Sequence, residues 1–136
     1  MSGEPITGSA TPQTFKKAER LTSKKIMDEL FNRGSSFVLY PFRVGSIEHD
    51  YNVPSKVQVL ISVPKKNFPL AVHRNRIKRL IREAYRKNKF LLIEKRSSTK
   101  KNLAFSIVFT DKKLPDYFLV EEKIIALLTQ LSRQIK

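Results

Sequence analysis

Hydrophobic residues recur at helical spacing in three segments of the chain, which predicts three helices. These segments are residues 23–33, 73–95 and 116–135. Thr22 or Ser23 can cap the first of them, because a hydroxyl side chain accepts hydrogen bonds from the free backbone N–H groups of a first turn. Gly34 follows that segment and is expected to end the helix in the left-handed conformation.

Three other segments have the composition or alternation of strands. Residues 56–63 alternate regularly, and residues 103–110 are rich in hydrophobic and β-branched types. The hydrophobic face of the first of these consists of Val57, Val59, Ile61 and Val63. Residues 35–49 are also strand-like, but Pro41 interrupts them, which predicts either one interrupted strand or two strands. The expected class is α/β (α+β), in the order α-β-β(-β)-α-β-α.

Length and composition limit the chain to one domain. It has 136 residues, of which 40% are hydrophobic, enough for one core. Residues 1–13 are rich in Ser, Thr, Gly and Pro, which predicts a flexible leader before a single domain at 14–136. No hydrophobic run is long enough to span a bilayer, and the chain has no cysteine. We therefore expect a soluble, cytoplasmic protein with no membrane partner.

Positive charge is concentrated in HRNRIKRLIREAYRKNK, residues 73–89, which holds eight Lys or Arg and one acidic residue, Glu83. The formal net charge of the whole chain is +15, which indicates a polyanionic partner. On a helix, most of these cations form a stripe opposite the hydrophobic arc. A solvated helix face is the alternative, but such faces usually mix charges of both signs. The near-absence of acidic residues favours a nucleic-acid interface.

Catalytic and metal-binding patterns are missing from the sequence. His49 and His73 are the two histidines, and they do not form an HxxxH or HExxH motif. The twelve acidic residues are scattered along the chain, which argues against a two-metal nuclease site. The sequence therefore predicts no catalytic residue and no metal site in the protein itself.

Three stretches together closely resemble the bacterial ribonuclease P protein subunit. They are AVHRNRIKRLIREAYR at 71–86, ISVPKK at 61–66 and RLTSKKIMDELFNRG at 20–34. The resemblance covers about residues 20–135. It implies a two-layer sandwich with a small mixed sheet, similar to a ribosomal-protein domain, and a left-handed crossover between parallel strands. It also implies an accessory subunit of an endoribonuclease, in which the RNA subunit removes the 5′ leader of precursor tRNA.

The same resemblance implies roles for two groups of residues. The group expected to contact the RNA subunit is Lys65, Lys66, Arg74, Asn75, Arg76, Arg79 and Arg86. The group expected to line a cleft for the precursor-tRNA leader is Met27, Phe31, Phe37, Tyr40, Phe42, Lys78 and Arg82. The aromatic rings at 37, 40 and 42 could stack with unpaired bases, and packing in the core is the alternative for each.

The expected partners are the catalytic ribonuclease P RNA and precursor tRNA, with no protein partner required. No cofactor is expected on the protein alone. Mg²⁺ is expected in the holoenzyme, held mainly by RNA phosphates, because their hard oxygens suit it. Two alternatives stay open: another RNA-binding module, such as a ribosomal protein, and a DNA-binding protein that reads the major groove with residues 73–89. A strand and a loop precede that helix instead of a helix-turn-helix, which disfavours the second alternative.

Overall fold

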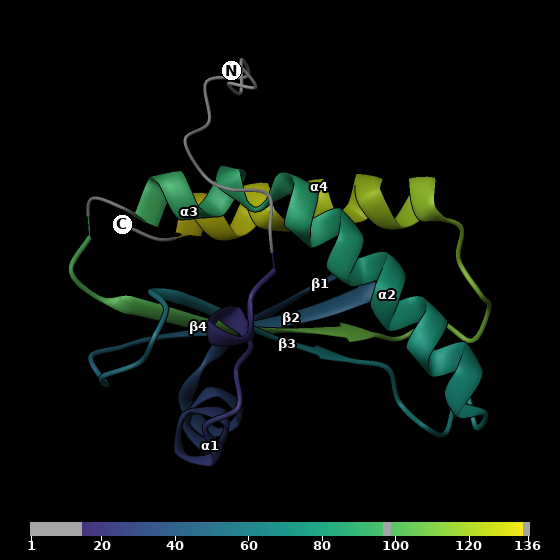
Figure 1. The fold of residues 1–136 in the computed structure, drawn as a ribbon, viewed down its shortest axis with the longest axis horizontal. Coiled ribbons are helices and arrows are strands. Elements are labelled where there is room, and N and C mark those ends of the chain that lie inside the picture. The colour runs from purple at the N-terminus through teal and green to yellow at the C-terminus, as the bar shows by residue number, and fades with distance from the viewer. Residues whose placement is uncertain (1–14, 97–98, 135–136) are drawn as a thin grey trace.

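The computed structural model describes residues 15–96 and 99–134, so the leader predicted at 1–13 lies outside the described part. Four strands form one mixed sheet in the order β1-β2-β4-β3 (Figure 1). β1 (Ser35–Leu39) and β2 (Phe42–His49) are antiparallel neighbours. β4 (Asn102–Phe109) pairs antiparallel with β2 and parallel with β3 (Val57–Ser62). The mixed sheet that the resemblance implied is therefore present.

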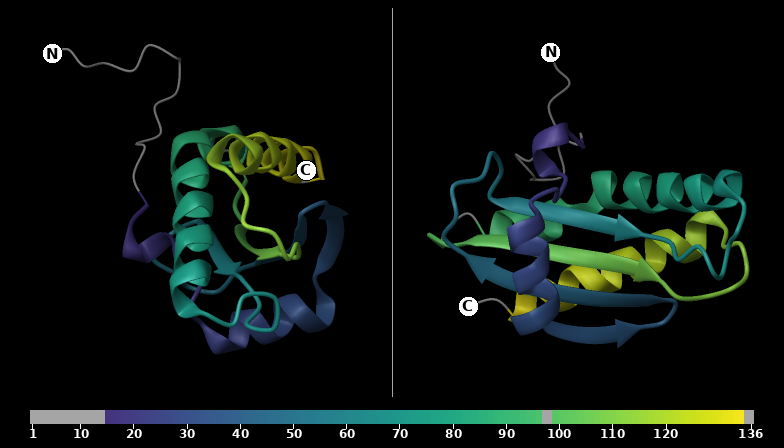
Figure 2. Two further views of the ribbon diagram at one scale, coloured as in Figure 1. Left: turned by 90° about the vertical axis from the view of Figure 1, so that its right-hand side faces the viewer. Right: turned by 90° about the horizontal axis from the view of Figure 1, so that it is seen from below.

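Helices lie on both faces of this sheet (Figures 1 and 2). α2 (Ala71–Asn88), α3 (Phe90–Arg96) and α4 (Tyr117–Gln134) lie on one face. α1 (Lys24–Arg33) lies on the opposite face, after the short 3-10 helix η1 (Lys17–Glu19). The sheet and α2 to α4 form the two main layers that were predicted, and α1 adds a partial third layer.

The larger core lies between the sheet and the helices α2 and α4. Alternate strand residues point into it, as the period-two pattern predicts. The strand residues are Phe42, Val44, Val57, Val59, Leu103, Phe105, Ile107 and Phe109. The helix residues include Ile77, Ile81, Ala84 and Tyr85 from α2 and Val120, Ile124, Leu127, Leu128 and Leu131 from α4. A smaller core of Leu21, Ile26, Leu30 and Ala104 fixes α1 to the other face.

The interrupted strand predicted at 35–49 is two strands. Tyr40 and Pro41, joined by a cis peptide bond, lie in the turn between β1 and β2. β3 and β4 are parallel neighbours connected through α2 and α3, which is the connection that the predicted crossover requires. Its left-handed sense stays a prediction. No helix in the described residues is both long and hydrophobic enough to cross a membrane.

Gly34 ends α1, but not in the left-handed conformation predicted from the sequence. Its φ of −75° and ψ of 161° are extended, and its N–H donates to the carbonyl of Leu30. A Cβ at this position would lie 2.4 Å from the Leu30 carbonyl oxygen and 2.8 Å from the Ser46 carbonyl oxygen. The glycine is therefore needed because a Cβ would collide with the last turn of α1 and with the backbone of β2.

The single helix predicted for residues 73–95 is broken at Lys89. This lysine is 3% exposed, and its ammonium group lies 2.6 Å from the carboxylate of Glu19. The Lys89 carbonyl accepts hydrogen bonds from the N–H groups of Leu92 and Ile93, which begin α3. Leu92 is fully buried in the core. The helical spacing continues through the break, which is why the sequence predicted one helix.

Candidate nucleic-acid interface

Predicted RNA-binding residues are exposed on the outer face of the first half of α2. Ile77 and Ile81 are buried against the sheet, so the opposite face points outward. Asn75, Arg76 and Arg79 are exposed there and line one hollow together with hydrophobic neighbours. Within the described part of the chain, neither arginine forms a salt bridge. Their charge is therefore available to a ligand.

Arg74 has a different position from its neighbours. Its guanidinium donates to the carbonyl oxygens of Phe68 and Pro69, both at 2.8 Å. These bonds tie the loop before α2 to the first turn of the helix. Lys65 and Lys66 are exposed on the same loop. Arg74 thus holds the loop in place, and part of its hydrogen-bonding capacity is used inside the protein.

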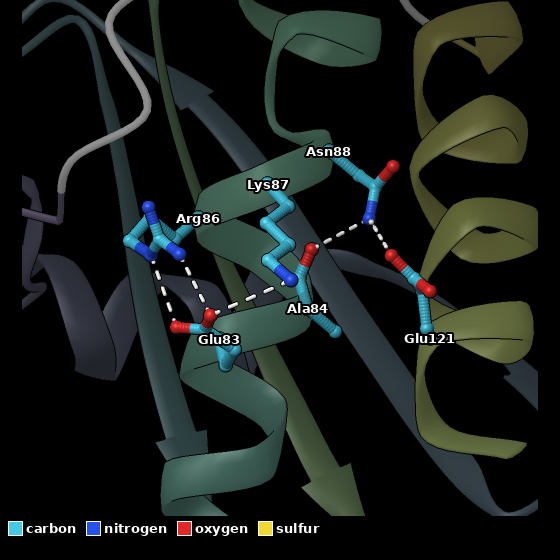
Figure 3. A network of polar contacts seen from close by, with 6 residues as sticks. All are labelled: Glu83, Ala84, Arg86, Lys87, Asn88 and Glu121. Carbon is cyan, nitrogen blue, oxygen red and sulfur yellow. Dashed lines mark hydrogen bonds and ion pairs between the residues drawn. The ribbon is translucent and has the colours of Figure 1, made fainter. Parts of the chain in front are cut away.

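The second half of α2 is partly neutralised by Glu83 (Figure 3). Arg86 donates to both oxygens of this carboxylate, from Nε at 3.0 Å and from Nη2 at 2.7 Å. The Lys87 ammonium lies 3.7 Å from the same carboxylate. The bonds from Arg86 lower the pKa of Glu83, and in return they raise the pKa of Arg86. A phosphate approaching Arg86 must therefore compete with Glu83.

A polar bridge fixes this same half of α2 against α4. The amide nitrogen of Asn88 donates to the carbonyl of Ala84 and to the carboxylate of Glu121 (Figure 3). With Glu83 and Glu121 both nearby, negative charge accompanies the cations of this half. The positive charge without an internal partner is therefore concentrated toward the start of α2.

Lys78 and Arg82, on the same helix, are half-buried. The pKa of Arg82 is lowered, first by burial and then by the positive charges of Arg20 and Arg79. Arg20, in the segment between η1 and α1, thus lies near Arg82, as Arg79 does. Sequence reasoning missed Arg20, because it is a single arginine in a segment without periodicity.

The aromatic residues assigned to the leader cleft separate into two environments. Phe42 is 0% exposed in the main core, with its ring centroid 5.7 Å from that of Phe109. Phe37 packs against the same core and is half-buried. Phe42 is a correction, because alternation turns it into the core below α2 and α4. A stacking role for the half-buried Phe37 stays a prediction. Tyr40 and Phe31 are the accessible rings, exposed by 62% and 65%.

The predicted cleft also combines residues from opposite faces of the sheet. Phe31 and Met27 belong to α1, whereas Lys78 and Arg82 belong to α2, and Figure 2 shows these helices on opposite sides. Met27 is half-buried against the smaller core. A strand of RNA that meets both groups must pass around an edge of the sheet.

The two histidines lie in different environments. His49 is buried, its Nδ1 accepts from the backbone N–H of Tyr51, and its burial lowers its pKa. His73 is half-buried on α2. In residues 15–96 and 99–134, no three His, Asp or Glu side chains are arranged to hold a metal ion. The expectation that RNA holds Mg²⁺ stays a prediction.

A small α/β domain that presents one cationic helix face is typical of nucleic-acid-binding proteins. The comparison with protein-family models narrows this class, because the Ribonuclease P model matches residues 15–131. The chain belongs to the ribonuclease P protein family. The predicted family is confirmed, and the match disfavours both the ribosomal-protein and the DNA-binding alternative.

Relatives and solved structures agree with this assignment. A ribonuclease P protein component from Porphyromonas gingivalis strain W83 is 37% identical over 131 residues, covering 92% of this chain and 93% of the relative. One from Chlorobium phaeobacteroides is 33% identical over 125 residues, covering 85% and 86%. The RNase P protein from Thermotoga maritima superposes with a TM-score of 0.63 at 26% identity, covering 82% and 96%. The one from Staphylococcus aureus gives 0.62 at 22% identity, covering 85% and 96%, which supports the fold.

Proposed function

We propose that this chain binds the catalytic RNA of ribonuclease P and the 5′ leader of precursor tRNA, and that the RNA carries out the cleavage. Family membership supports a role in tRNA 5′ processing. The observation that carries the proposal is the cationic first half of α2, where Arg76 and Arg79 have no salt bridge within the described residues. Such unpaired charge suits a polyanion better than it suits solvent.

The RNA subunit contacts the start of α2 in this proposal. Arg76, Arg79 and Asn75 face outward and can donate to phosphate oxygens, and arginine does so with two parallel bonds. Lys65 and Lys66 extend the surface from the loop that Arg74 holds. Each phosphate that is neutralised releases condensed counterions, so affinity should fall steeply as salt rises.

In this proposal the leader is bound by accessible rings and by the two half-buried cations of α2, Lys78 and Arg82. Phe31 and Tyr40 are the exposed aromatic residues of the predicted cleft, and they are available for stacking. Lys78 and Arg82 reach the leader from the α2 side. Because α1 and α2 lie on opposite faces, the leader passes around the sheet edge between them (Figure 2).

The protein acts by binding and by neutralising charge. Two sets of phosphates, those of the RNA subunit and those of the substrate, repel each other when they approach, and the cations between them reduce this repulsion. Mg²⁺ in the holoenzyme would be held mainly by RNA and would supply the activated water for hydrolysis. No protein partner is required in this proposal.

Reconstitution tests the proposal. The chain alone should not cleave precursor tRNA, whereas the chain together with a bacterial ribonuclease P RNA should yield tRNA with a mature 5′ end at low Mg²⁺. The RNA alone at the same Mg²⁺ concentration is the control. Metal-dependent leader removal by the RNA-free chain, or no stimulation of the RNA by the chain, would contradict the proposal.

A further inference from the structure

A pocket outside the predicted interface lies between η1, the start of α1 and the loop that joins β2 to β3. Its volume is about 570 Å³, which is within the range of small-ligand sites. The side chains of Ile26, Tyr51, Val53 and Pro54 contribute hydrophobic walls. Neither group of residues predicted to bind RNA contributes to this pocket.

Three cations surround these hydrophobic walls. Lys17 comes from η1, Arg20 from the segment that follows it and Lys25 from the first turn of α1. Among the described residues, no carboxylate lines the pocket. A pocket with hydrophobic walls whose charged lining residues are all cations is complementary to a nucleotide, whose base is flat and whose phosphate is anionic.

The aromatic wall of the pocket is held in a fixed position. The Tyr51 hydroxyl donates to the carboxylate of Glu29, and the backbone N–H of Tyr51 donates to Nδ1 of His49. The Lys25 ammonium lies 4.7 Å from the centroid of the Tyr51 ring. A ring that is already ordered loses little entropy when a base packs against it. A nearby phosphate would draw Lys25 away from the ring toward the anion.

The positively charged rim of the pocket adjoins a cation of α2. Arg20, at its rim, is close enough to Arg82 to lower the pKa of that guanidinium. An RNA backbone that follows Lys78 and Arg82 therefore meets Arg20 next. The N-terminal segment at residues 1–14 is a less suitable occupant, because its single acidic residue, Glu4, offers little to a cationic rim.

We propose that this pocket binds one unstacked nucleotide of a single-stranded RNA whose backbone crosses Arg20 from the Arg82 side. The base packs against Tyr51, Val53 and Pro54, while Lys25 and Arg20 contact the flanking phosphates. The proposal rests on the RNA-binding function proposed above and adds a nucleotide site to it.

The test uses the full chain and a short oligoadenylate, with an abasic oligonucleotide of the same length as a probe for the backbone alone. In NMR titrations of the wild-type chain, the backbone amides of Asn52, Val53 and Gln58 should shift with oligoadenylate. They should shift much less with the abasic probe, which lacks bases to enter the pocket. Equal shifts with both probes, or no shifts at these amides, would overturn the nucleotide site without requiring any variant.

A pair of variants adds a measurement of affinity. Thr22 is exposed and lines the pocket, so Thr22→Trp should fill it and weaken oligoadenylate binding at least about fivefold. Ala126→Trp places the same ring on the exposed face of α4 and should leave affinity unchanged. If a folded Thr22→Trp chain binds oligoadenylate as tightly as the Ala126→Trp chain, the proposal is wrong.

Assembly with ribonuclease P RNA, measured on the same preparations, separates the two proposals. Both variants should assemble normally, because neither changes α2. Failure of the wild-type chain to assemble would contradict the proposed function, whereas the amide shifts and the Thr22→Trp affinity decide the pocket alone.

Discussion

The salt dependence of RNA binding should distinguish two exposed arginines of α2, Arg76 and Arg79, from Arg86, which is paired with Glu83. Arg76 and Arg79 are exposed and have no salt bridge within the described residues, whereas Arg86 donates to both oxygens of Glu83. In the proposed interface, replacing the first two by alanine removes two phosphate contacts. Replacing Arg86 removes a charge that is already matched by a carboxylate. Per charge removed, the first change should therefore reduce the salt dependence of RNA binding more than the second.

The expected magnitude follows from counterion release. Each lost contact lowers the slope of log K against log salt by about 0.9, so Arg76→Ala with Arg79→Ala should lower it by about 1.8. At about 0.1 M salt, this corresponds to about 2.5 kcal/mol of lost affinity for the RNA subunit. Arg86→Ala should change the slope by less than half as much, because Glu83 already offsets its charge.

The assay is equilibrium binding of ribonuclease P RNA over a series of salt concentrations. The charge-matched control replaces Lys100 and Lys101, which are exposed in the segment just before β4, by alanine. It should leave the slope within error of the wild type. Equal slope changes for Arg86→Ala and for each of Arg76→Ala and Arg79→Ala would refute the argument that Glu83 neutralises the second half of α2.

Three further predictions concern single side chains. Phe31→Ala should weaken binding of precursor tRNA to the holoenzyme by about 1 to 3 kcal/mol and leave mature tRNA unaffected, because the exposed ring is free to stack; equal losses for both RNAs would contradict a leader contact. Phe42→Ala should cost about 3 to 5 kcal/mol of unfolding free energy in urea denaturation, since the ring is fully buried; a loss below about 1 kcal/mol would argue against core packing. Lys89→Ala should lower the unfolding free energy by about 3 to 5 kcal/mol in the same experiment, because Glu19 stays buried without its partner. Replacing Glu19 by Gln as well should recover part of that loss, and no recovery would show that the buried charge is not the cause.

Local patterns in the sequence predicted most of the secondary structure. The patterns in 56–63 and 23–33 predicted the buried Val57, Val59, Ile26 and Leu30. They did not predict that Gln58, on the other face of β3, is buried as well. The break at Lys89 could not be predicted, because the helical spacing continues through it; the buried ion pair of Lys89 with Glu19 joins residues far apart in the chain. The close approach of Gly34 to the Ser46 carbonyl of β2 likewise could not be predicted from its local sequence.

The candidate site was predictable only where it depends on local sequence patterns. The arc of α2 that carries Arg76 and Arg79 follows from the helical period. Which cations are neutralised depends on the rotamer of Glu83, which had several possible partners in the sequence. Phe42 and Tyr40 are close in the chain, yet sheet pairing buries one and the turn exposes the other. Arg20 joins Arg82 only in the folded chain.

The absence of cysteine from the chain allows one direct test of the central claim, that α2 faces the RNA subunit. A single cysteine introduced at the exposed Val72, or in a control chain at the exposed Ala126 of α4, can carry a tethered iron chelate that cleaves nearby RNA. We predict strong cleavage of ribonuclease P RNA in the holoenzyme from position 72 and little from position 126. Cleavage of the RNA subunit mainly from position 126, or equally from both positions, would contradict the assignment of α2 as the RNA-binding face.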